Sequence, residues 1–207
     1  MFKFRIYMDF NKEERWLNTM AKQGWQLVGA SFGYQFAKTE PEDANIKIDY
    51  RIFKRKEDYI DYCIMFEDSG WMHIAGSINS GNQYFKRVRE DGNEDIFSDQ
   101  ASKAGRYKRL ASMNLVFLIS YLPIIMALIM TQALPVSSIL NPKRWYLTPG
   151  LWEMEGIKFW RAFLFETPFA LFRGGAWVFY LIMIMLFIFL IYKAKVLYKE
   201  SYKNKSN

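Results

Sequence analysis

The sequence predicts an α+β N-terminal domain in the cytosol, followed by a transmembrane hairpin of two helices. Three observations predict this arrangement. The apolar residues make up 51% of the 207-residue chain, and in the second half they form two long uncharged runs. The first half instead alternates apolar and polar residues over short distances. Within it, residues 2–38 and 46–87 show the same order of features, which indicates a tandem repeat.

The overall charge, taken alone, suggests a different class of protein. The chain has 28 basic and 21 acidic residues, and a formal net charge of +7 is typical of proteins that bind nucleic acid. The basic excess, however, lies beside the two apolar runs, so we do not expect nucleic acid as a direct partner. The single cysteine, Cys63, and the single histidine, His73, exclude internal disulfides and most Cys- or His-based metal sites. We therefore expect no metal and no cofactor.

The first repeat begins with a predicted strand and a predicted helix. Apolar and polar residues alternate over residues 2–10, which predicts a half-buried strand. Asn11 is expected to cap the helix, with Glu13 and Glu14 in its first turn, where the helix dipole favours acidic side chains. The expected buried face of this helix is a stripe of apolar residues: Trp16, Leu17, Met20 and Ala21.

The second repeat follows the same plan. A strand is predicted from residue 46, and the next helix has an apolar stripe of Tyr59, Ile60, Cys63, Ile64 and Phe66 or Glu67. Gly24 and Gly70, each followed by tryptophan, are expected to end the two helices in the left-handed conformation. A hairpin of two strands follows each glycine. We therefore predict a βαββ unit twice over residues 1–98, with a ferredoxin-like character. The expected result is one mixed sheet of about six strands with both helices on one face.

Two segments are long and apolar enough to cross a bilayer, which takes about 20 residues. Residues 110–133 are predicted as the first transmembrane helix and residues 173–193 as the second, since each contains an uncharged apolar run. Neither uncharged run contains an ionisable side chain, which argues against a channel or transporter. A basic helical linker, residues 99–109, connects the domain to the first span.

The flanking charges predict the orientation in the plasma membrane. Lysine and arginine residues near membrane spans are concentrated on the cytosolic side. They precede the first span. They also lie at the end of the second span and in the basic tail of residues 194–207 that follows it. Both termini are therefore expected in the cytosol, in contact with the inner leaflet. The basic residues on which this prediction depends are Lys103, Arg106, Lys108, Arg109, Lys193, Lys195 and Lys199.

The predicted extracytoplasmic segment, residues 134–172, is rich in aromatic residues. Tryptophan and tyrosine favour the boundary between lipid and water, so we expect a short interfacial helix over about residues 149–165. A pocket for a lipid or an amphiphilic drug is the alternative for this segment. The candidate interfacial anchors are Trp145, Trp152, Trp160, Trp177 and Tyr192.

No set of catalytic residues can be recognised, so we do not expect an enzyme. The candidate surface for a partner or ligand is aromatic and lies between the two repeats, where a flat amphiphile or a peptide would stack. For Trp25 and Trp71, the tryptophans at matching positions, packing in the core under each helix is the favoured interpretation. The candidate surface comprises Trp16, Trp25, Tyr34, Tyr50, Tyr62, Trp71 and Tyr84.

Several segments resemble a bacterial membrane-protein family known as domain of unknown function 2812. They are FRIYMDFNKEERWLNTMAKQGWQL, YQFAK, IDYRIF, FEDSGWMHIAG, YFKR and EDIFSDQASKAGRYKR. The resemblance covers most of residues 2–109 and implies C-terminal spans and a genetic neighbourhood with PadR-type repressors. It has no catalytic residues to carry over.

Together with the residues, this resemblance favours a non-enzymatic sensor or adaptor in the membrane. Its expected partner is a regulatory protein, such as a PadR-like transcriptional repressor, or another membrane protein. A second copy of the chain is a further candidate partner. Two alternatives stay open: a module that binds a lipid or small amphiphile, and an accessory subunit of a membrane transporter or enzyme.

Overall fold

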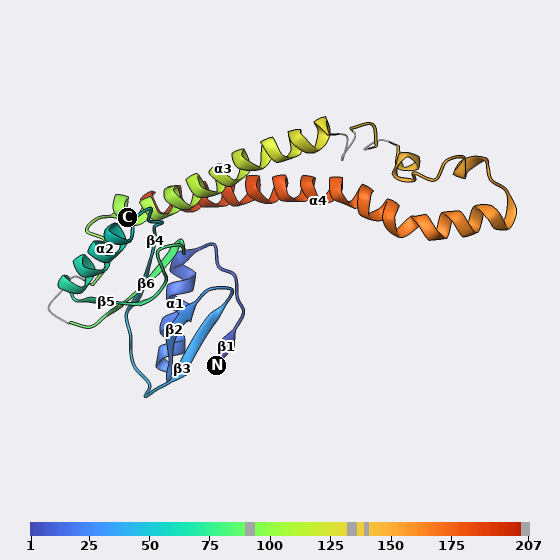
Figure 1. Ribbon diagram of the computed structural model, residues 1–207. Helices are drawn as coiled ribbons and strands as arrows, with labels where there is room; N and C mark the ends of the chain where they lie inside the picture. Colours follow the sequence, from blue (N-terminus) through green and yellow to red (C-terminus); the bar gives the residue numbers. More distant parts are fainter. Residues whose placement is uncertain (90–93, 132–135, 139–140, 204–207) are drawn as a thin grey trace. The chain divides into compact units, whose positions relative to one another are not determined.

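The computed structural model describes residues 1–89, 94–131, 136–138 and 141–203 (Figure 1). The chain divides into two compact units. The first comprises Met1–Ser112 together with Ile191–Asn207, and the second comprises Met113–Leu190. The first unit is an α+β domain, as the sequence predicts.

The α+β domain contains two three-stranded antiparallel sheets. The first has the order β1-β3-β2 and the second the order β4-β6-β5. Helix α1 (Phe10–Lys22) follows β1, and helix α2 (Lys56–Asp68) follows β4. The strands are β1 (Phe2–Lys3), β2 (Trp25–Ala30), β3 (Tyr34–Lys38), β4 (Ile46–Tyr50), β5 (Trp71–Ala75) and β6 (Asn82–Arg87).

The prediction of one mixed sheet was wrong. Strands β2 and β5 are the edges at which the sheets approach each other. Each of these strands has a bulge: the register shifts between Leu27 and Gly29 in β2, and between His73 and Ala75 in β5. A bulge bends a strand and disturbs the ladder of hydrogen bonds beside it. The bulges therefore account for two separate sheets rather than one.

The predicted strand over residues 2–10 is also mostly absent. Strand β1 pairs with β3 only at Phe2 and Lys3, and the side chains of Phe4 and Ile6 are 67% and 80% exposed. Residues 4–9 lead from β1 into α1, whose N-cap is Asp9 rather than Asn11. The Asp9 carboxylate accepts a hydrogen bond from the Asn11 N–H at 3.0 Å, and residues 4–8, between β1 and this cap, are not paired in a sheet.

The glycine ends of both helices are confirmed, since Gly24 and Gly70 have φ angles of +76° and +85°. In α1 the predicted apolar stripe is buried, apart from the half-buried Trp16. In α2 the prediction was partly wrong, because Ile60 and Ile64 lie on the exposed side. The side chains that α2 buries are Tyr62 and Phe66, which pack with Trp71 and Phe85.

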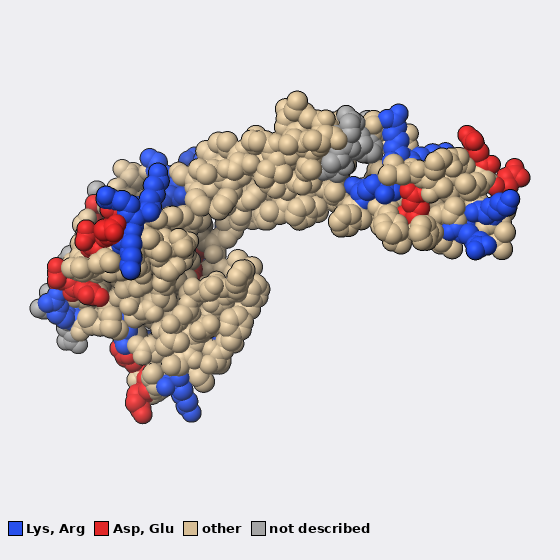
Figure 2. All heavy atoms as spheres, in the orientation of Figure 1, with Lys and Arg blue, Asp and Glu red and all other residues tan. Residues whose placement is uncertain are grey.

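The chain has two helices that are long and apolar enough to span a membrane. They are α3 (Gln100–Met130) and α4 (Gly156–Lys203), with mean hydropathies of 2.2 and 2.5 in their most apolar windows. Figure 2 shows no charged side chain on the visible face of their central parts. The rings of Phe117 and Phe187 stack across them with centroids 6.2 Å apart. The predicted end of the first span, residues 132–133, lies outside the described residues.

The segment between these helices differs from the prediction of a separate interfacial helix. Short 3-10 turns occupy Val136–Ser138, Pro142–Trp145 and Leu151–Glu153, and α4 then begins at Gly156 and continues through the predicted second span. Pro168 lies inside α4. A proline removes one backbone hydrogen bond, but here it does not end the helix. The Thr167 hydroxyl donates to the Phe163 carbonyl at 2.6 Å in the preceding turn.

Candidate functional site

The first turns of α3 are fixed to the α+β domain by Arg106. Its side chain is fully buried and donates to the Glu14 carboxylate of α1. It also donates to the Ile48 carbonyl of β4 at 2.6 Å and to the Asn11 side-chain oxygen at 2.7 Å. A buried guanidinium is stable only with acceptors of this kind. The side chain of Arg106 therefore connects α3 to both α1 and β4.

The Arg106 guanidinium also lies among aromatic rings. Its central carbon is 5.1 Å from the ring centroid of Phe10 and 5.3 Å from that of Phe97. The next residue, Tyr107, is buried as well, and its hydroxyl donates to the Asp9 carboxylate at 3.1 Å. Cation–π contacts are strongest where water is excluded, so this junction combines charge pairing with apolar packing.

A second arginine of α3 binds a second buried carboxylate. Arg109 donates to the Asp49 carboxylate and to the Tyr50 carbonyl, both at the end of β4. Asp49 is 4% exposed and also accepts from the Tyr62 hydroxyl of α2 at 2.8 Å. Strand β4 and helices α2 and α3 therefore share one carboxylate.

A third buried carboxylate, Glu13, connects the two sheets. The hydroxyls of Tyr34, on β3, and Tyr84, on β6, both donate to its Oε1 at 2.7 Å. Its Oε2 has no hydrogen-bond partner among the described residues. Burial raises the pKa of Glu13 to about 7, although the two tyrosine hydrogen bonds lower it. We therefore expect the stability of this link to change with pH near neutrality.

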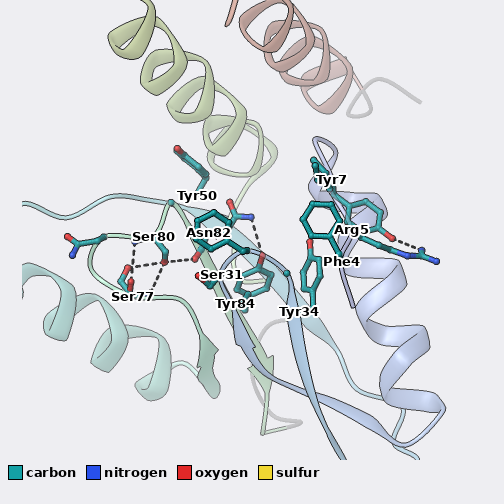
Figure 3. Close-up of a pocket in the computed structure, with 16 residues that line it drawn as sticks. Phe4, Arg5, Tyr7, Ser31, Tyr34, Tyr50, Ser77, Ser80, Asn82 and Tyr84 are labelled. Carbon is teal, nitrogen blue, oxygen red and sulfur yellow. Dashed lines mark hydrogen bonds between the residues drawn. The ribbon is translucent and has the colours of Figure 1, made fainter. Parts of the chain in front are cut away.

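A cavity of about 700 Å³ lies between the hairpin turns of the two sheets. One wall consists of residues 4–7 and 30–34, and the other of Ser77 and residues 79–82 with Tyr50 and Tyr84. Figure 3 shows Phe4, Arg5 and Tyr7 on one side and Ser77, Ser80 and Asn82 on the other. The first wall is mainly apolar and the second is polar and uncharged. Such a cavity suits an amphiphilic binding partner better than a small polar substrate.

The predicted aromatic surface is mostly core. Tyr34, Tyr50, Tyr62, Trp71 and Tyr84 are each at most 9% exposed. Trp16 and Trp25 are half-buried. Of the seven predicted residues, only Tyr34, Tyr50 and Tyr84 border the cavity, and they contribute little exposed surface. Packing in the core accounts for their burial, and for Trp71 the sequence already favoured this interpretation.

The predicted basic flank also differs from the structure at α3. Arg106 is buried against Glu14, so its charge is not available to lipids. Lys103 pairs with Asp95 at 2.7 Å, whereas Lys108 is exposed. The basic residues near the end of α4 are exposed, namely Lys193, Lys195 and Lys199.

The predicted interfacial anchors occupy different environments. Trp152, Trp160 and Tyr192 are 43%, 57% and 65% exposed. Trp177 is buried, which is not the position of an anchor. The half-buried Trp145 lies over Gly174, where a Cβ would come within 2.3 Å of the indole ring.

Sequence reasoning missed the buried carboxylates, although a signal for two of them was present. Residues at positions i, i+3, i+4 and i+7 share one face of a helix. Counting from Phe10, these positions are Glu13, Glu14 and Leu17, and all four side chains are buried. Within the described residues, no three His, Cys, Asp or Glu side chains gather as metal ligands, and the absence of a cofactor stays a prediction.

Comparison with known proteins gives one match. The sequence model of the family described as "Protein of unknown function (DUF2812)" matches residues 9–119. No curated protein and no solved structure is detectably similar to the chain. The matched residues extend from the cap of α1 into α3 and include every carboxylate and arginine of the junction described above. Because the match covers more than half of the 207 residues, the chain belongs to the DUF2812 family.

Proposed function

We propose that the chain is a non-enzymatic sensor or adaptor, anchored in the plasma membrane by α3 and α4 with both termini in the cytosol. Two observations support the anchoring: the length and hydropathy of the two helices, and the exposed lysines near the end of α4. We further propose that the α+β domain is a tandem βαββ repeat. The identical relative strand orders, β1-β3-β2 and β4-β6-β5, support this.

The buried junction at Arg106 carries the proposal. A domain on a flexible linker would be free to turn without affecting its anchor. Here, three consecutive turns of α3 bring Lys103, Arg106 and Arg109 into ion pairs with residues of the domain. A displacement of α3 must therefore break these contacts or move α1 and β4 with it. This is the mechanical property that a sensor or adaptor needs.

The outer face of α2 is the surface that we propose for a protein partner. Ile60, Ile64 and Met65 are 43%, 48% and 51% exposed. The helix sequence KEDYIDYCIMFED surrounds them with acidic residues. An apolar stripe with an acidic rim is complementary to a basic protein surface with apolar anchors. A transcriptional regulator has such basic surfaces, so the PadR-like repressor implied by the family resemblance is consistent with this face.

The test is capture of a regulator by the full chain in detergent or nanodiscs. A photo-crosslinking residue at Met65 should form an adduct with a basic regulatory protein identified by mass spectrometry. The double variant Ile60→Ser with Ile64→Ser should lose this adduct. A crosslinker at Glu40, an exposed position after β3 and away from α2, is the control. If both positions capture the same proteins, or if the double variant retains the adduct, the proposal for this face is wrong.

A second candidate function is the binding of a small amphiphile, favoured by the cavity with one apolar and one polar wall. Trp16 is close to this cavity, since its ring centroid is 5.5 Å from that of Tyr7 and 4.7 Å from that of Tyr34. A bound amphiphile should therefore change the tryptophan fluorescence of the full chain. A Trp16→Phe variant should lose that change, and a ligand effect that persists in the variant would place the site elsewhere.

A further inference from the structure

Three large apolar side chains are exposed together at the rim of the cavity. Phe4, Ile6 and Phe32 are 67%, 80% and 92% exposed, and all three line the same wall. We call this set the apolar rim. A cluster of such side chains beside a cavity usually marks a surface with a partner. The described residues of the first compact unit leave the apolar rim exposed.

The charge around the apolar rim favours a lipid headgroup layer. Arg5 lies between Phe4 and Ile6 and is the one charged side chain among the described residues that line the cavity. It donates to the Tyr7 hydroxyl at 3.0 Å and lies over the Trp16 ring at 5.1 Å. No carboxylate of the described lining would repel an anionic phosphate. Aromatic side chains with a basic neighbour are typical of segments at the membrane surface.

The opposite wall of the cavity offers groups that suit the same layer. Ser77, Ser80 and Asn82 contribute hydroxyls and an amide without charge (Figure 3), and Asn79 adds a second amide. The cavity thus has an apolar side for acyl chains and a polar side for hydrated headgroups. A protein partner would more often meet a closed apolar patch with a polar rim on all sides.

Chain continuity places this cavity beside the start of the first span. Tyr50 lines the cavity, and its carbonyl accepts a hydrogen bond from Arg109. The next residue, Leu110, begins the uncharged run of α3. These residues all belong to the first compact unit. If α3 enters the membrane at Leu110, the headgroup layer begins one residue after Arg109, which contacts Tyr50 in the cavity wall.

We propose that the apolar rim rests on the inner leaflet, with Phe4, Ile6 and Phe32 in the headgroup boundary and Arg5 at the lipid phosphates. This inference rests on the proposed membrane anchoring and adds a second, peripheral contact with the same bilayer. The domain is then held at the membrane at two points, the α3 junction and the apolar rim. A ligand or lipid that alters the headgroup layer would act directly on the domain.

The test uses the full chain in nanodiscs of phosphatidylcholine and phosphatidylglycerol, with Cys63→Ala as background. An environment-sensitive fluorophore is attached at Phe32→Cys. The matched control is Ile64→Cys on the exposed face of α2, and Leu122→Cys, 52% exposed within α3, reports whether the span is in lipid. We expect nitroxide lipids to quench the Phe32 and Leu122 probes, and aqueous iodide to quench the Ile64 probe several-fold more than either.

The outcomes separate this inference from the proposed anchoring. Lipid quenching at Leu122 with full iodide access at Phe32 would overturn the contact of the apolar rim and leave the anchoring intact. A lack of lipid quenching at Leu122 would overturn the anchoring itself, and the contact of the apolar rim with it. Protection of the Phe32 probe from iodide without lipid quenching would assign the apolar rim to a second copy or a protein partner instead. The Arg5→Gln variant should show weaker quenching of the Phe32 probe by nitroxide lipids, and the loss should be larger in anionic nanodiscs than in neutral ones.

Discussion

Removing both Arg106 and Glu14 should cost the α+β domain less stability than the sum of the two single removals. In Arg106→Met, the Glu14 carboxylate stays buried without its guanidinium partner. Breaking a buried pair from one side costs about 3–5 kcal/mol. Glu14 keeps the Ile48 N–H as a donor at 3.2 Å and Lys47 at 3.9 Å. We therefore expect the lower end of this range, about 3 kcal/mol.

The reverse variant, Glu14→Gln, leaves the guanidinium buried with two neutral acceptors, the Ile48 carbonyl and Asn11. We again expect a cost of about 3 kcal/mol. The double variant leaves no unpaired buried charge, so its cost should fall short of the sum by roughly 2 kcal/mol, as coupled neighbours do. Lys108→Met is the control, because it removes a positive charge from an exposed position of the same helix.

Hydrogen–deuterium exchange of the full chain measures these effects without isolating the domain. The Ile48 N–H donates to Glu14 and therefore reports on the junction directly. A loss of about 3 kcal/mol corresponds to roughly 100-fold faster exchange where exchange follows opening. An exchange rate in Arg106→Met equal to that of the wild type would refute the argument that the two charges support each other. A double variant whose cost equals the sum of the two single costs would refute it as well.

Three further predictions concern other parts of the chain. Because burial raises the pKa of Glu13 from 4.5 to about 7, the domain should lose about 3 kcal/mol of stability as pH rises across this window. Thermal unfolding of Glu13→Gln should show a flatter dependence of stability on pH. An unchanged dependence in this variant would refute the assignment to Glu13. Gly24→Ala should cost about 2 kcal/mol or more in denaturant unfolding, because of its positive φ and because its Cβ would lie 2.7 Å from the Thr39 carbonyl, whereas an unchanged midpoint would contradict this. Glu166→Gln should weaken the hydrogen bonds from the N–H groups of residues 147 and 148 to residue 166 by about 1–3 kcal/mol. The variant should then be cleaved faster by protease at these residues, and resistance equal to that of the wild type would count against this prediction.

The sequence predicted the regular elements where a local rule fixes them. Gly24 and Gly70 end their helices because few other residues adopt a positive φ easily. The uncharged runs predicted two long apolar helices because composition alone defines that property. The stripe of α2 was only partly right because this helix has apolar residues on several sides, so periodicity gave no reason to bury Tyr62 rather than Ile60 and Ile64.

The candidate site was less predictable because its contacts connect distant residues. Arg106 and Glu14 are 92 positions apart, and Tyr84 and Glu13 are 71 apart. No local pattern pairs them. A carboxylate in the first turn of a helix has an ordinary explanation in the helix dipole, and that explanation concealed the position of Glu13 on the buried face. The separation into two sheets depended on bulges, which leave no clear mark in a strand sequence.

The arginines in the first turns of α3 show how one residue type can serve two purposes that the sequence does not separate. The orientation rule counts lysines and arginines near a span as if each were available at the membrane surface. Arg106 and Arg109 are instead paired with Glu14 and Asp49 once the domain has folded. Before folding, all four groups are accessible and the arginines still count toward orientation. We therefore expect Arg106→Met to disturb the folded junction while the exposed lysines after the second span continue to hold the C-terminus on the cytosolic side.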